Sequence, residues 1–146
     1  TELQAAIGIV QLEKLSDIIE RQRKNKFLLM ESLRGLPVEF RKTSDPDGDL
    51  GDTVVMLLGS ETQAQRVSNK LASCGFGTKN LPSAMRWHFA SFWPHLLGEA
   101  DGRWDQSQAI LERSLALAVS VTWSVEDVER LSDAVHSAVS EAVQQH

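Results

Sequence analysis

The opening of the chain constrains the fold most, because it contains no proline before residue 37 and only Gly8 as a weak helix breaker. We therefore expect one long helix over residues 2 to about 34, ended by Gly35 and Pro37. Between residues 3 and 12, only Gln4 and Gln11 carry polar side chains. A helix that is apolar on every side needs neighbours on more than one side.

The second half of this helix has a single apolar stripe separated by charged residues at positions 20–26. This pattern is typical of a solvated helix that packs through one side. The stripe that we expect to be buried comprises Leu15, Ile19, Leu29 and Leu33.

Three later segments have the composition of strands. Residues 53–58 are rich in β-branched and apolar side chains, and a short strand is expected around residues 76–79. Residues 115–121 alternate large and small side chains, which predicts a strand whose two faces meet different neighbours.

Helices are expected between and after these strands. Ser60 and Gln63 form a capping-box pattern before a helix that Gly75 closes, and a short helix is expected over residues 104–113. The last helix begins at Ser124, capped with Asp127. Its expected buried stripe comprises Val128, Leu131, Val135, Ala138 and Ala142. This order predicts an α+β fold with a small three-stranded sheet covered by helices, in one domain spanning residues 1–146.

Composition excludes several classes of protein. A net charge of -5 argues against nucleic acid as a partner. No apolar run approaches the roughly 20 residues needed to cross a bilayer, and no signal peptide is visible, so we expect no membrane partner. The single cysteine, Cys74, permits no intramolecular disulfide and suits the cytoplasm. Its place at a helix end, before Gly75, predicts a buried structural thiol.

The opening Thr1-Glu-Leu-Gln-Ala-Ala-Ile-Gly8, continued by Gln11-Leu-Glu-Lys-Leu15, closely resembles a signature of the DegT/DnrJ/EryC1/StrS sugar aminotransferases. Residues 114–121 and 123–128 resemble, more loosely, the last strand and last helix start of that family. The resemblance implies the C-terminal small domain of a pyridoxal-phosphate (PLP) enzyme of fold type I. It also implies a homodimer and amino transfer to a keto sugar.

In that family, the lysine that forms the Schiff base with PLP lies upstream of this opening motif. A Schiff-base lysine needs desolvation or a cationic neighbour to be nucleophilic at neutral pH. The lysines of this chain are expected on solvated helix faces, in loops or at a strand end. We therefore expect no catalytic residue here, no PLP bound by this chain alone, and no activity in isolation.

An aromatic loop over residues 81–97 holds the candidate substrate-facing residues, His88, Arg86, Trp87 and Trp93. His88 best matches a family histidine near the sugar-binding cleft, and aromatic rings stack on sugar faces. The alternative is that the aromatic side chains only pack the loop onto the sheet. The loop also resembles that of the 8-amino-octulosonate aminotransferases, a subfamily acting on eight-carbon keto sugars.

No metal site is expected. Asp45, Asp47, Asp49 and Asp52 lack the glycine and glutamate spacing of an EF-hand, so a solvated turn is the interpretation. His88 and His95 have no cysteine or acidic motif nearby, which argues against zinc.

Two functional hypotheses remain open. The chain is either a domain fragment of a sugar aminotransferase or a free-standing self-associating or regulatory module that kept the fold and lost the chemistry. We expect the chain to form a homodimer through its first helix, and fraying of the helix start is the alternative. The expected contact residues of the homodimer are Leu3, Ile7, Ile9, Val10 and Leu12.

Overall fold

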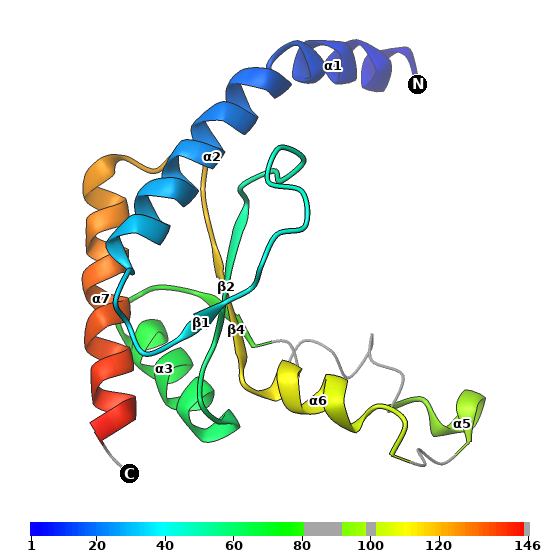
Figure 1. Cartoon of the computed structure of the whole chain (residues 1–146). Helices are drawn as coiled ribbons and strands as arrows, with labels where there is room; N and C mark the ends of the chain where they lie inside the picture. Colours follow the sequence, from blue (N-terminus) through cyan, green and yellow to red (C-terminus); the bar gives the residue numbers. More distant parts are fainter. Residues whose placement is uncertain (81–91, 99–101, 145–146) are drawn as a thin grey trace.

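The computed structural model describes residues 1–80, 92–98 and 102–144. These residues form helices and strands in the mixed order expected from the sequence (Figure 1). In chain order the elements are α1 (Glu2–Glu13), α2 (Leu15–Ser32), β1 (Glu39–Phe40), β2 (Thr53–Leu57), α3 (Glu61–Ser73), β3 (Thr78–Asn80), α5 (Pro94–Leu97), α6 (Asp105–Glu112), β4 (Ser114–Ala118) and α7 (Val125–Gln144).

The strands form one antiparallel sheet in the order β1-β2-β4-β3. The expected strands correspond to β2, β3 and β4, and the α+β class is confirmed. The prediction of three strands was wrong, because β1 adds a fourth at the β2 edge. With only two residues, Glu39 and Phe40, β1 is too short to give an alternating pattern in the sequence.

One face of the sheet is buried under helices. Val54 pairs with Leu117 and Met56 with Leu115, so these four side chains share a face. All four are buried in the main core cluster. Figure 1 shows α2, α3 and α7 gathered on the same side of the sheet. They contribute to the core Leu29, Leu33, Ala64, Val67, Leu71, Val128, Leu131, Val135, Ala138, Val139 and Ala142.

The expected single N-terminal helix is instead two helices that meet at Lys14. Lys14 has φ -86° and ψ -9°, close to a helical turn, so the chain bends there without leaving helical geometry. Leu29 and Leu33 are buried as expected, whereas Leu15 is exposed and that part of the prediction was wrong. Leu15 lies at the bend, before α2 reaches the sheet.

Both predicted helix caps are present. The Ser60 hydroxyl accepts from the Gln63 N–H at 3.2 Å, although the Gln63 side chain returns to the Gly59 N–H rather than to Ser60. Ser124 and Asp127 form the reciprocal box, with the Asp127 N–H donating to the Ser124 hydroxyl at 3.2 Å and the Ser124 N–H donating to the Asp127 carboxylate at 3.0 Å. The expected buried stripe of α7 is confirmed at all five positions.

Cys74 is exposed, so the prediction of a buried thiol was wrong. The residue is the C-cap of α3, and its N–H donates to the carbonyl oxygens of Lys70 and Leu71. Gly75 follows with φ +85°, which turns the chain back so that Phe76, rather than Cys74, packs against the core. No helix among the described residues is long and apolar enough to cross a membrane.

Candidate functional site

The sheet has a second face, and small side chains line it. Ala116 lies opposite Val55 and Lys79, and Ala118 lies opposite Thr53. A cavity of about 340 Å³ opens on this face. Its lining residues are Asp52, Thr53, Gly77, Thr78, Lys79, Ala116 and Ala118.

A second cavity, of about 350 Å³, shares Gly77 and Ala118 with the first. We call the two together the sheet trough. The second cavity is largely apolar, because Phe76, Leu117, Trp123 and Leu131 contribute to its walls together with Gly75 and Asp127. Glycine has no side chain and alanine has only a methyl group, so these residues leave space open between β3, β4 and the start of α7.

Few charges reach the trough. The backbone N–H and the hydroxyl of Ser124 both donate to the Asp127 carboxylate and hold the pKa of that group below its usual range. Asp127 is therefore ionised at neutral pH, and its carboxylate already caps the start of α7. Asp52 and Lys79 are exposed, and the lining residues that the structure describes include no histidine and no cysteine. The described residues of the trough can hold a ligand through apolar contacts and polar interactions, but none of them is an activated nucleophile.

The alternation of large and small residues in β4 was the sequence signal for this face. Leu115 and Leu117 are buried in the core as expected, while Ala116 and Ala118 line the first cavity of the trough, and Leu117 also borders the second cavity. No sequence pattern indicated that Gly77 and Trp123, which are far apart in the chain, border the same space.

The aromatic loop is only partly covered by the structure. Arg86, Trp87 and His88 lie outside the described residues. Trp93 is partly buried at the start of α5, and His95 is exposed on α5. The substrate-facing role of these residues therefore stays a prediction.

The lysines do not fit PLP. Lys14, Lys24, Lys42 and Lys79 are exposed. The remaining two, Lys26 and Lys70, are partly buried but form ion pairs with Asp49 and Glu141. The Glu141 carboxylate raises the pKa of Lys70, which is the opposite of what an imine-forming amine needs.

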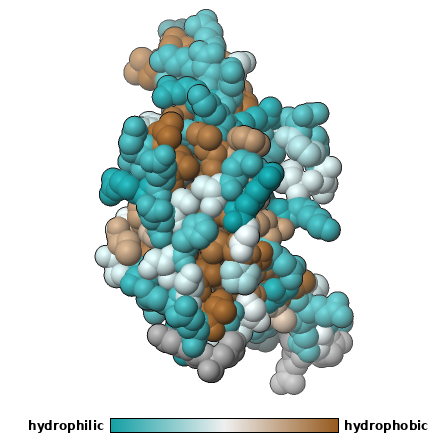
Figure 2. Space-filling view, turned by 60° about the vertical axis from the view of Figure 1, so that its left-hand side comes forward, coloured by the Kyte–Doolittle hydropathy of each residue, from teal (hydrophilic) through white to brown (hydrophobic). Residues whose placement is uncertain are grey.

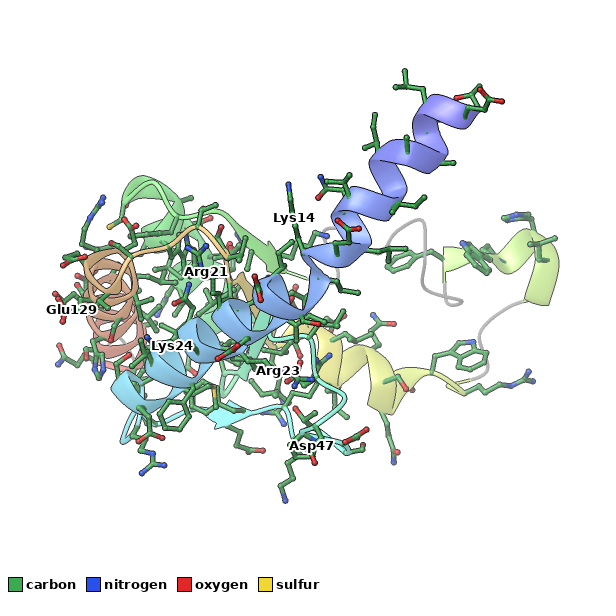
Figure 3. The ribbon with its side chains drawn as sticks, turned by 90° about the horizontal axis from the view of Figure 1, so that it is seen from above. Lys14, Arg21, Arg23, Lys24, Asp47 and Glu129 are labelled. Carbon is green, nitrogen blue, oxygen red and sulfur yellow. The ribbon has the colours of Figure 1, made fainter. Side chains whose placement is uncertain are left out.

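The acidic loop is held against α2. The Arg23 guanidinium donates to the backbone carbonyl oxygens of Asp47 and Asp49, and Figure 3 shows Arg23 and Asp47 on the same side of α2. The Asp49 carboxylate accepts from Lys26 and from the Gly51 N–H. Among the described residues, no group of three or more histidine, cysteine, aspartate or glutamate side chains is placed to hold a metal ion.

The surface of α1 is apolar and open. None of its residues is buried, and the five large apolar side chains expected to mediate self-association are all exposed. Brown apolar atoms emerge at the top of the molecule in Figure 2, where α1 lies. The prediction that these side chains contact a second copy stays a prediction.

Residues 1–136 match the sequence profile described as the DegT/DnrJ/EryC1/StrS aminotransferase family. The chain belongs to this family. The fold of this DegT/DnrJ/EryC1/StrS family chain is also similar to that of several solved structures.

One is Spr1654 from Streptococcus pneumoniae, solved in apo, PLP and PMP forms. The apo form has a TM-score of 0.77 and 15% identity, and the match covers 99% of this chain and 36% of that one. A second is PseC of Helicobacter pylori, an aminotransferase involved in the biosynthesis of pseudoaminic acid. It has a TM-score of 0.76 and 13% identity, and the match covers 96% of this chain and 38% of that one. A third is DesI in the presence of its TDP-sugar product. It has a TM-score of 0.71 and 21% identity, and the match covers 96% of this chain and 36% of that one. The chain thus spans little more than a third of the length of these structures.

Proposed function

We propose that this chain is the C-terminal small domain of a PLP-dependent sugar aminotransferase of fold type I. The observation that carries the proposal is the family match over residues 1–136 together with a fold likeness to about a third of each neighbouring structure. In the complete protein, amino transfer to a keto sugar would use PLP, which supplies an electron sink for the exchange of the amino group. The longer protein would work in the cytoplasm as a homodimer.

The role proposed for this domain is to shape the substrate side of the site. The sheet trough offers a floor of small side chains bordered by Asp52 and Lys79. The chain leaves β3 at Asn80, and the aromatic loop follows it in the sequence. His88, Arg86, Trp87 and Trp93 are the residues proposed to face a sugar. Within the family, the subfamily proposed is that of the 8-amino-octulosonate aminotransferases, because their loop resembles the aromatic loop of this chain.

The chain alone is proposed to be inactive. An imine-forming lysine must be desolvated or lie beside another cation, and each lysine here is exposed or paired with a carboxylate. The test is incubation of the 146-residue chain with PLP, borohydride reduction and peptide mapping. We expect only scattered, substoichiometric adducts on several lysines. A stoichiometric adduct on a single lysine, with an aldimine absorbance band, would contradict the proposal.

A second candidate function is a free-standing self-associating or regulatory module. The exposed apolar surface of α1 favours this candidate, because exposed apolar patches often mark protein–protein interaction sites. The DNA upstream of the Thr1 codon distinguishes the two candidates. An open reading frame encoding a lysine-bearing PLP domain supports the aminotransferase domain, and a start codon beside Thr1 supports the free-standing module.

A further inference from the structure

The second cavity of the sheet trough opens onto the hydrophobic core. It lies where the turn from α3 into β3 meets the end of β4 and the start of α7, and its volume is about 350 Å³ (Figure 1). Two of its lining residues, Leu117 and Leu131, belong to the core cluster and are only 1% and 2% exposed. A ligand that enters this cavity therefore contacts residues that packing already holds in place.

The volume of the cavity suits a small molecule. Small-molecule sites in proteins typically have volumes of about 300–1,000 Å³. An apolar cavity of roughly 150 Å³ already holds a benzene molecule. At about 350 Å³, the second cavity has room for two fused rings and a short substituent.

Aromatic side chains form part of the wall. Phe76 and Trp123 line the cavity and also pack against the core. The backbone of Trp123 is held in place, because its N–H donates to the Ser120 carbonyl oxygen at 3.4 Å and its carbonyl oxygen accepts from the Asn25 amide at 3.3 Å. Aromatic rings pair with other rings in offset-stacked or edge-to-face arrangements. A wall that is fixed before binding loses little conformational freedom when a planar ring contacts it.

The charge at the cavity disfavours anions. Among the lining residues that the structure describes, Asp127 is the one charged side chain, and none is a lysine or an arginine. Arg130 lies 3.6 Å from the Asp127 carboxylate, but its side chain is 72% exposed, so solvent screens that pair. The Asp127 carboxylate repels an anionic ligand and attracts an ammonium group. Cations are also attracted to the face of a tryptophan ring.

We propose that the second cavity binds a small planar aromatic molecule that carries an amine, with its ring against Phe76 and Trp123 and its ammonium group toward Asp127. This inference goes beyond the proposed function, which uses the first cavity and its polar border. A keto sugar does not suit the second cavity, because its hydroxyl groups would lose water against the leucine side chains without gaining hydrogen bonds.

The test is an NMR titration of the ¹⁵N-labelled 146-residue chain without PLP. Three probes share an indole ring and differ in charge, since tryptamine is cationic, indole is neutral and indole-3-acetate is anionic. We expect tryptamine to shift the backbone amide signals of Gly75 and Gly77 and the indole N–H signal of Trp123, with a dissociation constant on the order of 1 mM. Indole-3-acetate should bind at least about threefold more weakly, with indole between the two.

Two pairs of matched variants assign the binding to this cavity. A Cβ atom added at Gly77 meets no atom within 4 Å apart from its neighbours in the chain. Gly77→Leu therefore places a side chain in the cavity and should weaken tryptamine binding at least about tenfold. Gly8→Leu is the control, because its Cβ is equally unhindered and it lies on α1, outside the lining. Asp127→Asn should bring the affinities for tryptamine and indole-3-acetate within about twofold of each other, whereas Asp133→Asn, at an exposed position of α7, should leave their difference unchanged.

Other results would overturn the proposal. These are the absence of saturable shifts up to about 10 mM of probe, saturable shifts that lie elsewhere on the chain, and binding of indole-3-acetate as tight as that of tryptamine. Tryptamine binding that persists in Gly77→Leu, or that is lost in Gly8→Leu, would also place the ligand outside the cavity. The shifts in the wild type locate the site even where Gly77→Leu does not fold. Neither PLP nor activity enters the measurement, so a negative result leaves the proposed function untouched.

Discussion

The side-chain amide of Asn25 in α2 donates a hydrogen bond of 2.9 Å to the carbonyl oxygen of Ser120, 95 positions later in the chain. The same amide also donates to the Trp123 carbonyl oxygen at 3.3 Å. One helical turn earlier, Gln22 donates to the Val119 carbonyl oxygen at 2.7 Å. These bonds fix the turn that leads from β4 into α7, and they thereby place Trp123 at the border of the sheet trough.

Replacing Asn25 should destabilise the fold. Asn25 is 8% exposed, so Asn25→Leu removes the donor to the Trp123 carbonyl oxygen and leaves the Ser120 carbonyl oxygen with the Trp123 N–H at 3.4 Å, in a place that water reaches poorly. We expect the free energy of unfolding to fall by about 1–3 kcal/mol, measured by urea denaturation. The neighbouring Lys24→Leu is the control, since Lys24 is exposed and its replacement should stay within about 0.5 kcal/mol. Equal effects of the two changes would show that the Asn25 bonds do not hold the turn.

The Lys26–Asp49 pair should make stability depend on pH in the acid range. The hydrogen bond from Lys26, followed by that from the Gly51 N–H, lowers the pKa of Asp49 in the folded chain. A carboxyl group with a lowered folded pKa stabilises the native state above its unfolded pKa, which is about 3.9, and this stabilisation is lost as the pH falls through the folded pKa. The pair lies near the surface, with about a fifth of each side chain exposed. Its contribution should therefore not exceed about 1 kcal/mol.

The measurement compares the wild type with Asp49→Asn by urea denaturation at neutral pH and at successively lower pH. We expect the variant to be less stable at neutral pH and the difference to shrink below about pH 4. Asp52→Asn is the control, because Asp52 is exposed and outside this contact. A difference that stays constant down to the acid transition would contradict an electrostatic origin.

Cys74 should react in the native state. Its thiol is exposed at the end of α3, so a disulfide reagent that reports free thiols should titrate one thiol per chain without denaturant. We expect the same number of reactive thiols per chain after unfolding. The reaction rate in the native state should be close to that of an accessible model thiol. A thiol that reacts only in denaturant would show that Cys74 is covered in solution.

The sequence determined the elements whose signals are local. Periodicity placed α7 with its five buried positions, and the side chains of Ser60 and Ser124 marked two helix starts, because capping depends on residues only three apart. The family signature at the start of the chain also needed no tertiary information. The alternation in β4 indicated that its two faces differ, because side chains in a strand alternate by geometry.

Tertiary structure alone decided the features that depend on distant partners. β1 exists as a strand because residues 39–40 pair with β2, and two residues carry too little local preference to show this in advance. The bend at Lys14 and the exposure of Leu15 follow from where α2 meets the core, and the exposure of Cys74 follows from the turn at Gly75 that sends Phe76 inward. The trough arises because β3, β4 and the start of α7 converge, so it depends on long-range packing that no single segment encodes.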